Sequence, residues 1–400
     1  MEASRQDDRY RQRGVSAGKE EVHAAIARQD AGLFSGAFCK IIADELTGSF
    51  DHCLIVHADT AGTKASLGYL AWREGFPNVW RGIAQDALVM NLDDLGCVGA
   101  LGPFLISNTI GRNAKLIPGA VLGEIIDGYQ RLCDLLTRDG IPCLMTGGET
   151  ADVGDLVRTL DVGCTITARL PRAEVIDAAR ITVGDVLVGF SSLGQAAWED
   201  APNSGIGSNG LTSARHELLG GYREKYPETY APQIDPALVY CGKHRLEEPL
   251  PGDPAFTVGS ALLSPTRTYL PLIKRLLQRI PRADVHGLIH CSGGGQTKIL
   301  RFGAPGAARG LRFIKDALFP VPPLCAAIQA STGLKWSEMY SVYNMGHRLE
   351  AALPAAHAAT AIAVARDLGL DAKIIGRVEA NDGPGNVVEV RGGHGTFVYR

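Results

Sequence analysis

The chain has 400 residues, a formal net charge of −3, and 46% hydrophobic and 21% charged residues. This is the composition of an ordinary globular protein that is too long for one typical domain, so we expect two or three domains. The near-neutral charge lacks the clustered basic face that a nucleic-acid binder needs, which argues against such a partner. No apolar run is long enough to predict a membrane span.

The nine cysteines are scattered through apolar stretches and include no Cys-x-x-Cys pair. An odd number of cysteines in a long chain argues against a disulfide framework, and the spacing argues against a zinc ribbon. The charged N-terminus is unlike a signal peptide. We therefore expect buried thiols in a reducing compartment, which predicts a cytoplasmic protein.

The predicted elements alternate between strands and helices in both halves of the chain. Hydrophobic periodicity predicts strands at 53–58, 141–145, 160–170, 184–190, 285–289 and 372–378, and helices at 82–91, 118–139, 268–280 and 354–368. Residues 198–256 are rich in Gly, Pro and charge, and predict loops or an insertion. This order is typical of an α/β or α+β fold in which helices cover sheets.

Changes in composition divide the chain into four parts. A polar N-terminal segment covers residues 1–30, a first domain residues 31–171, a second domain residues 172–380, and a tail residues 381–400. The boundary after residue 171 follows the end of an alternating strand at Pro171. The tail contains two glycine-rich turns and predicts an appended loop and strand.

The segment Asp59-Thr-Ala-Gly-Thr-Lys64 follows the first predicted strand and has the residue types of a phosphate loop. Gly62 lets the backbone approach a ligand closely, Thr63 offers a hydroxyl, and Lys64 offers a point charge suited to phosphate. Asp59 is the kind of hard oxygen ligand that magnesium prefers. The spacing is not that of a Walker P-loop, and a polar turn after a strand explains the segment about equally well.

Two further segments place carboxylates near the ends of predicted elements. Asp93 and Asp94 lie just beyond the helix at 82–91, where a carboxylate is electrostatically disfavoured unless it has a partner such as a metal ion. Thr146-Gly-Gly-Glu-Thr150 follows the strand at 141–145, and its glycines with Glu149 predict a metal and phosphate loop. The alternatives are a solvated helix end and a simple glycine turn.

Two small-residue loops occur later, at Gly205–Gly210 and at His290–Gly295. Each presents enough backbone N–H groups to wrap an anion. His290 is suited to donating or accepting a proton near neutral pH, although a lone histidine before a glycine turn is more often structural.

The order of these motifs resembles that of the phosphoribosylformylglycinamidine cyclo-ligase (aminoimidazole ribonucleotide synthetase) family. The resemblance runs from about residue 10 to 380 and includes the following segments: Asp59–Lys64, Asp93-Asp-Leu95, Gly147–Asp152, Ser208-Asn-Gly210, Leu263-Ser-Pro-Thr-Arg-Thr-Tyr269, His290–Gly295, Glu338-Met-Tyr340 and Asn344-Met-Gly346.

The resemblance implies a two-domain α/β subunit whose N-terminal sheet pairs with that of a second subunit, so that a homodimer shares a barrel. It implies ATP- and Mg²⁺-dependent closure of the imidazole ring of a small nucleotide in de novo purine synthesis. The site residues that it implies fall into four groups: catalytic Lys64, Asp94 and His290; nucleotide-binding Asp59, Gly62, Thr63, Lys64, Asp94, Gly147, Gly148 and Glu149; substrate- or phosphate-binding Ser208, Asn209, Gly210, Thr266, Arg267, Gly293, Gly294 and Gly295; and metal-binding Asp59, Asp94 and Glu149.

Several residues depart from the family pattern. Thr60 and Ala61 replace Gly-Val in the first loop, Asp93 replaces asparagine, and Gly207 replaces a histidine before Ser-Asn-Gly. These changes predict a divergent branch, because Lys64, Asp94 and Glu149 all remain.

Four other functions fit the same residues less well. Selenophosphate synthetases carry a reactive cysteine in an early glycine loop, near which Cys39 lies, and thiamine-phosphate kinases use ATP on a similar scaffold. Hydrogenase-maturation dehydratases end in a cysteine tail, whereas this chain ends in Phe-Val-Tyr-Arg400. A non-catalytic nucleotide-binding protein would also tolerate the departures at Thr60 and Gly207.

Overall fold

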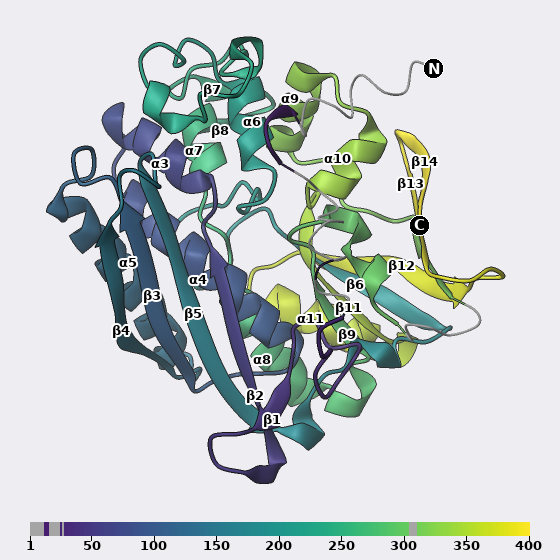
Figure 1. The fold of residues 1–400 in the computed structure, drawn as a ribbon. Helices are drawn as coiled ribbons and strands as arrows, with labels where there is room; N and C mark the ends of the chain where they lie inside the picture. Colours follow the sequence, from purple (N-terminus) through teal and green to yellow (C-terminus); the bar gives the residue numbers. More distant parts are fainter. Residues whose placement is uncertain (1–11, 16–24, 26–27, 304–309) are drawn as a thin grey trace.

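The computed structural model describes residues 12–15, 25, 28–303 and 310–400. Most of the predicted segment 1–30 lies outside these residues. Within them, the chain forms two large sheets with helices between and around them (Figure 1). The fold is therefore mixed α/β with one sheet in each half of the chain, as the sequence predicted.

The first sheet has the strand order β1-β2-β5-β3-β4. Its strands are β1 (Ile42–Asp44), β2 (Ser49–Thr60), β3 (Phe104–Arg112), β4 (Cys143–Asp152) and β5 (Leu160–Pro171). All neighbours pair antiparallel except β3 and β4, which are parallel because α5 (Gly119–Arg138) crosses over between them.

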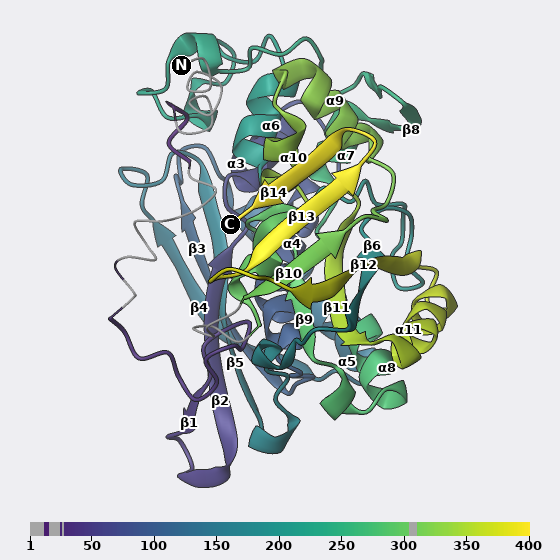
Figure 2. The same cartoon turned by 90° about the vertical axis from the view of Figure 1, so that its right-hand side faces the viewer.

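The second sheet has the strand order β14-β13-β10-β12-β6-β11-β9. Its strands are β6 (Asp185–Ser191), β9 (Gly287–His290), β10 (Leu311–Lys315), β11 (His347–Pro354), β12 (Ala372–Ala380), β13 (Val387–Gly392) and β14 (Gly395–Tyr399). Strands β13 and β14 extend the edge beside β10 (Figure 2). The predicted tail is therefore a hairpin of this sheet, because β13 pairs with β10.

The remaining helices and a short hairpin surround these sheets. They are α3 (Lys64–Arg73), α4 (Val79–Cys97), α6 (Leu211–Leu218), β7 (Pro249–Leu250), β8 (Asp253–Thr257), α7 (Val258–Leu263), α8 (Leu270–Arg279), α9 (Pro323–Thr332), α10 (Trp336–Val342) and α11 (Ala355–Asp367). No described helix has the length and apolar character needed to cross a bilayer.

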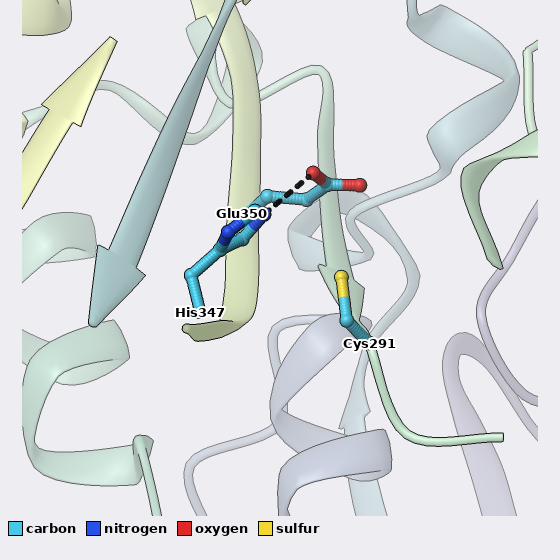
Figure 3. Close-up of side chains that lie close together, drawn as sticks. All are labelled: Cys291, His347 and Glu350. Atoms are coloured by element: carbon cyan, nitrogen blue, oxygen red, sulfur yellow. Dashed lines mark ion pairs between the residues drawn. The ribbon is translucent and has the colours of Figure 1, made fainter. Parts of the chain in front are cut away.

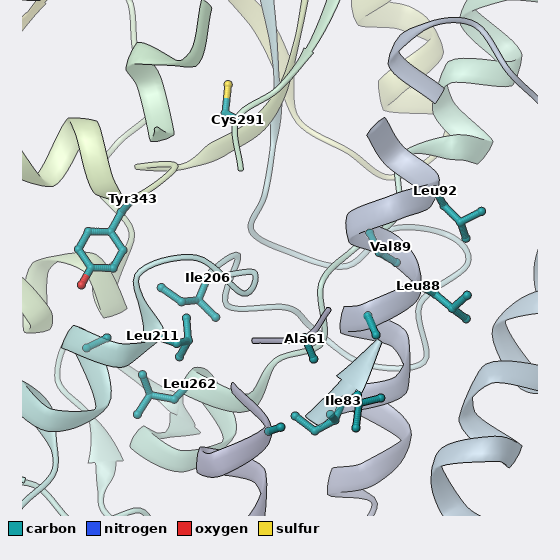
Figure 4. Packing of buried hydrophobic residues seen from close by; sticks show 14 of the residues in the cluster. Ala61, Ile83, Leu88, Val89, Leu92, Ile206, Leu211, Leu262, Cys291 and Tyr343 are labelled. Carbon is teal, nitrogen blue, oxygen red and sulfur yellow. The ribbon is translucent and has the colours of Figure 1, made fainter. Parts of the chain in front are cut away.

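Helix α4 is the central element of the molecule. It packs against β2, β5 and α5 on one side and against β9 and α8 on the other, so nearly all of its residues are buried. Helix α5, in contrast, buries only one stripe, which includes Val121, Ile125 and Tyr129. Figure 4 shows Val89 and Leu92 of α4 with Ile206 and Leu211 from the second half, all members of one hydrophobic core that spans both halves.

Most predicted elements are confirmed, and two need correction. The helix predicted at 82–91 continues to Cys97, so Asp93 and Asp94 lie inside a buried helix. The segment Thr146–Thr150, predicted as a loop, is part of strand β4, because its backbone pairs with β3. Residues 198–256 form mostly turns and loops, as expected, but also contain helix α6 and the paired strands β7 and β8, which were not predicted.

Candidate active site at the domain boundary

Asp94 joins the two halves of the molecule through two histidines. Its Oδ1 lies 2.8 Å from Nδ1 of His290, at the end of β9, and its Oδ2 lies 3.5 Å from Nε2 of His57, on β2. The side chain of His290 is fully buried, whereas those of Asp94 and His57 are 13% and 21% exposed. The cluster therefore opens toward solvent on the side of His57.

The hydrogen bonds around the cluster assign the protons of both imidazoles. Asn91 donates its amide group to the carbonyls of Ala87 and Cys164 at 3.1 and 3.3 Å, so its Oδ1 must accept from Nδ1 of His57 at 2.8 Å. Nε2 of His57 is thereby left facing Asp94. This tautomer is inferred from the donors and acceptors around the ring.

Arg348 assigns the proton of His290 in the same way. An arginine is always a donor, so its Nε donates to Nε2 of His290 at 3.2 Å. Nδ1 of His290 then donates to Asp94. His290 therefore orients the carboxylate, and Oδ2 of Asp94 is the oxygen that faces His57.

Lys298 adds a cation to this cluster. It lies in the 3₁₀ helix η6 (Gly295–Arg301), which begins in the glycine loop after His290. Burial lowers the pKa of Lys298, and the nearby charge of Asp94 opposes that shift. Its ammonium lies over the ring of Phe38, 5.1 Å from the ring centroid, and makes no hydrogen bond within the part of the chain that the structure describes, so its donors are available to an anion.

Arg348 also explains the glycine at position 207. Gly207 has a φ of +72°, and a Cβ added there would lie 3.3 Å from Nη1 of Arg348. The guanidinium group therefore occupies the space into which a side chain at position 207 would extend. Nη1 of Arg348 is buried and has no hydrogen-bond partner among the described residues.

The two glycine loops predicted from the sequence face each other beside this cluster. A Cβ on Gly293 would lie 3.6 Å from Oδ1 of Asn209. Ser208 shares a hydrogen bond with Thr266 at 3.1 Å. Gly210 has a φ of +77° and precedes α6, where the ring of Tyr343 packs closely against it. The structure thus brings Ser208–Gly210, Gly293–Gly295 and Thr266 into one region.

Lys64 lies in a different environment from the one predicted. Its side chain is fully buried, and Nζ donates to Oδ1 of Asp86 at 2.9 Å and to the carbonyls of Gly207 and Ser264 at 3.1 and 2.6 Å. Burial lowers the pKa of Lys64, and Asp86 opposes that shift. All three ammonium donors have acceptors, so Lys64 has none left for a phosphate.

All hydrogen-bond donors of the Arg267 side chain are likewise used within the protein. Nε and Nη2 hold both oxygens of Glu199 at 2.9 and 2.6 Å, and the remaining donors reach the carbonyls of Ser191, Leu193 and Gly194 at 3.0, 3.1 and 2.6 Å. Five donors therefore meet five acceptors. Arg267 therefore connects its own segment to residues 191–199, and it has no donor left for a substrate phosphate.

Asp93 also has a structural role. Its carboxylate accepts from the hydroxyl of Thr268 at 2.7 Å and from the backbone N–H of Tyr269 at 3.0 and 3.1 Å, where α8 begins. Burial raises the pKa of Asp93, although these hydrogen bonds oppose the shift. Of the two adjacent acids, only Asp94 is open to a ligand.

The three carboxylates predicted to bind magnesium do not meet within one chain. Across the first sheet, Asp59 of β2 is in register with Cys164 of β5, and Cys164 with Asn108 of β3. Glu149 pairs with the next residue of β3, Thr109. Three strand spacings of about 4.8 Å place Asp59 and Glu149 about 14 Å apart.

The two carboxylates also face different sides of the sheet. Asn108 is buried toward the helices, whereas Thr109 and Glu149 are exposed. The set of Asp59, Asp94 and Glu149 therefore does not fit one metal ion bound by a single chain.

Of the other predicted nucleotide-binding residues, Gly62 and Thr63 lie just after the C-terminal end of β2, and Gly147 and Gly148 lie within β4. Gly62 has a φ of +58°, and Thr63 shares a hydrogen bond with Thr212 at 2.7 Å. Gly147 has a φ of +106°. Gly148 packs directly on Asn108, whose side chain leaves no space for a Cβ. Gly147 and Gly148 thus lie in a strand, at a distance from the Asp94 cluster.

Cys39 lies beside Asp94 but lacks the features of a nucleophile. It is 8% exposed, and its Sγ lies 3.8 Å from the backbone oxygen of Asp94. Burial raises the pKa of the Cys39 thiol well above its usual range, and the charge of Asp94 adds to that shift. The thiol therefore stays protonated. No disulfide joins the described cysteines.

A second buried cluster contains Cys291, His347 and Glu350 (Figure 3). Their ligand atoms lie within 4.8 Å of one another, but Nζ of Lys315 already lies 2.8 Å from Oε2 of Glu350. Burial raises the pKa of the Cys291 thiol and lowers that of His347. A protonated thiol, a neutral imidazole and a lysine–glutamate pair balance in charge without a metal ion. Neither ring nitrogen of the buried His347 has a hydrogen-bond partner among the described residues.

The fold and the site together define a two-domain α/β protein with a polar cluster between its sheets. Two family models match it: AIR synthase related protein, N-terminal domain, over residues 37–170, and AIR synthase related protein, C-terminal domain, over residues 182–389. The chain belongs to the AIR synthase related family.

Several curated relatives are named phosphoribosylformylglycinamidine cyclo-ligase. The chain is 27% identical to that of Methanococcus vannielii over 334 residues, which cover 83% of this chain and 79% of the relative. It is 29% identical to that of Symbiobacterium thermophilum, over 84% and 83% of the two chains, and 28% identical to one of Anaeromyxobacter dehalogenans, over 88% and 87%.

Solved structures share the fold at low sequence identity. The chain matches a HypE–HypF complex with a TM-score of 0.58 at 15% identity, covering 96% of this chain and 99% of the other. It matches phosphoribosylformylglycinamidine synthase II from Thermotoga maritima with a TM-score of 0.54 at 13% identity. That match covers 98% of this chain but only half of the synthase. Identities this low show the fold alone.

Sequence patterns missed two residues of the cluster, Lys298 and Arg348, which were not predicted to lie near the site. His57 begins the segment 57–64 that was predicted to form part of the phosphate site, but it was given no role of its own. A signal for His57 was present, since it lies two residues before Asp59 on a strand, and both side chains are half-buried on the same face. No local sequence pattern predicts that Arg348 lies against Gly207, because the two residues are far apart in the chain.

Proposed function

We propose that this chain catalyses the ATP-dependent closure of formylglycinamidine ribonucleotide to aminoimidazole ribonucleotide, releasing ADP and phosphate in de novo purine biosynthesis. The observation that carries the proposal is the match of both domains, in order, to relatives named as this cyclo-ligase along more than four fifths of the chain. As an enzyme it would be a ligase that forms a C–N bond.

The Asp94 cluster suits this chemistry. An amide oxygen is a poor leaving group, and phosphoryl transfer from ATP turns it into a phosphate ester that an internal nitrogen displaces. Lys298 is placed to stabilise anionic oxygens, and the glycine loops offer backbone N–H groups. The facing atoms of His57 and Asp94 can take up the proton that the attacking nitrogen gives up.

Magnesium would neutralise charge on the phosphates of ATP. Asp94 is an oxygen ligand at the open side of the cluster, and Asp59 lies two residues beyond His57 near the end of β2. Because Glu149 does not reach them within one chain, we assign no step to the ion.

The homodimer belongs to the same proposal. Val56, Leu105 and Leu144 are 57%, 44% and 59% exposed and align in one row across the first sheet, on the face that α4 and α5 leave uncovered. Such a row is typical of a protein interface. A second copy of the same sheet would cover it.

A cytoplasmic location follows from the nucleotide substrate and agrees with the lack of disulfides among the described cysteines.

The deciding experiment is a coupled ADP-release assay with formylglycinamidine ribonucleotide, ATP and magnesium. We expect ADP release that depends on the substrate. No release with active, folded protein would exclude the proposed reaction.

The dimer is tested by light scattering on a Val56→Glu, Leu144→Glu double variant. We expect a monomer, while the control Ile126→Glu, on the exposed face of α5, keeps the mass of a dimer. A native protein that is already monomeric would contradict the proposed interface.

A further inference from the structure

A cavity with a volume of about 400 Å³ lies between the two halves of the molecule, away from the Asp94 cluster. Helices α4 and α5 form one wall, and the segments 198–203 and 265–268 of the second half form the other. Two residues that hold site residues in place also line it: Glu199, the partner of Arg267, and Thr268, the partner of Asp93. A volume of several hundred Å³ is the size range of small-molecule pockets.

The charges around this cavity leave one cation without a partner. Glu199 is held by Arg267, and Asp200 pairs with Arg131. Arg81, on the first turn of α4, is exposed and makes no hydrogen bond or ion pair with any residue that the structure describes. The four charged residues of the lining, two arginines and two acids, sum to zero. Arg267 neutralises Glu199 from outside the lining, so Arg81 is the lining cation that remains for an anion.

The remaining lining suits a planar ring. Trp198 offers an indole, and its buried N–H has no acceptor among the described residues. Gln85 donates its Nε2 to the carbonyl of Thr266 at 2.9 Å, which leaves its side-chain oxygen as an acceptor for an amino group. An aromatic surface, an amide acceptor and an arginine together match a base linked to a phosphate.

We propose that this cavity is a second binding site, distinct from the Asp94 cluster, for a nucleoside monophosphate. Arg81 binds the phosphate, and Trp198 and Gln85 contact the base. Because the segment at 265–268 also carries Thr266, which donates to Asp86, a ligand here would contact a loop that also borders the Lys64–Asp86 pair.

The test is calorimetric titration of the full chain with AMP, after saturation with a non-hydrolysable ATP analogue to occupy the proposed catalytic site. We expect saturable binding at one site, at least about 10-fold tighter than binding of adenosine or inorganic phosphate alone. The absence of saturable AMP binding would overturn the proposal, as would either half of the nucleotide binding as tightly as the whole.

Two variants locate the site. Arg81→Glu should weaken AMP binding more than about 10-fold, and because Arg81 is exposed the variant should fold normally. Trp198→Leu keeps an apolar side chain but removes the aromatic ring that contacts the base, and should weaken binding several-fold. Arg279→Glu, an exposed charge reversal at the end of α8, is the matched control and should bind as the native chain does. Native affinity in the Arg81→Glu variant would place AMP elsewhere and contradict the proposal.

Discussion

Helix α4 carries two charged clusters of opposite character. Asp86 and Lys64 are both fully buried, and every donor of the lysine has an acceptor. Two turns further along, Asp94 is partly exposed and faces a histidine across 3.5 Å. Both clusters contain residues that a sequence motif marks as catalytic. Only the second has the exposure and the free positions that a ligand requires.

The difference shows that a charged residue in a motif can serve the fold instead of the reaction. A buried ion pair whose hydrogen bonds are complete holds segments together, and removing one partner leaves an uncompensated charge. A cluster of charged side chains whose hydrogen bonds are not all made within the protein can instead form them with a substrate.

Lys64→Met should lower the free energy of unfolding by about 3–5 kcal/mol, because Asp86 stays buried without its partner. Chemical denaturation measures the change. Turnover should also fall, by on the order of 10²-fold or more, if Gly207 and Ser264 lose their positions with the lysine. Native stability together with lost turnover would show instead that Lys64 contacts the phosphates directly.

Asp94→Asn should reduce turnover by on the order of 10²-fold, because the neutral amide lacks the negative charge of the carboxylate that lies beside His57 and His290. The melting temperature should change little. Asp93→Asn makes the same substitution one residue away and is the matched control. It should retain turnover, because an amide oxygen can still accept from Thr268 and Tyr269. Equal losses in the two variants would contradict the separate roles.

The buried side chain of His216 makes the stability of the folded chain depend on pH. Burial lowers its pKa to about 2, and the charges of Arg215 and Arg13 add to that shift. In the unfolded chain, His216 takes up a proton with a pKa of about 6.5, whereas in the folded chain it stays neutral down to about pH 2. Protonation therefore favours the unfolded state, and the folded state loses stability as the pH falls from 6.5 toward 2. At pH 5.5 the cost is about 1.4 kcal/mol relative to neutral pH.

This cost is measured as the change in the free energy of unfolding between pH 7.5 and 5.5, compared with a His216→Gln variant, which cannot titrate. The native chain should lose more stability than the variant. Parallel losses would mean that His216 is protonated in the folded state.

Cys39→Ser should have the smallest effect on catalysis, with turnover within about twofold of the native value, because the buried thiol is protonated and its role is packing. Complete loss of turnover in a folded variant would favour a selenophosphate synthetase-like reaction.

The sequence by itself determined the class of fold and the family. Alternating and helical periodicities located β2, α5, β5, α8 and α11, because each has a continuous apolar face. The order of the motifs carried the resemblance that the two family models bear out. Strand β4 was partly misread, because glycines that look like a turn lie in an edge strand paired with β3.

Only the tertiary structure decided which motif residues face one another. Asp93 and Asp94 are indistinguishable in sequence, but neighbouring residues of a helix point about 100° apart, so one meets α8 and the other the domain boundary. Lys64 and Asp86 pair across 22 residues, and Arg348 lies against Gly207 across a still longer separation. Such contacts depend on how α4 packs between two sheets, which no local pattern records.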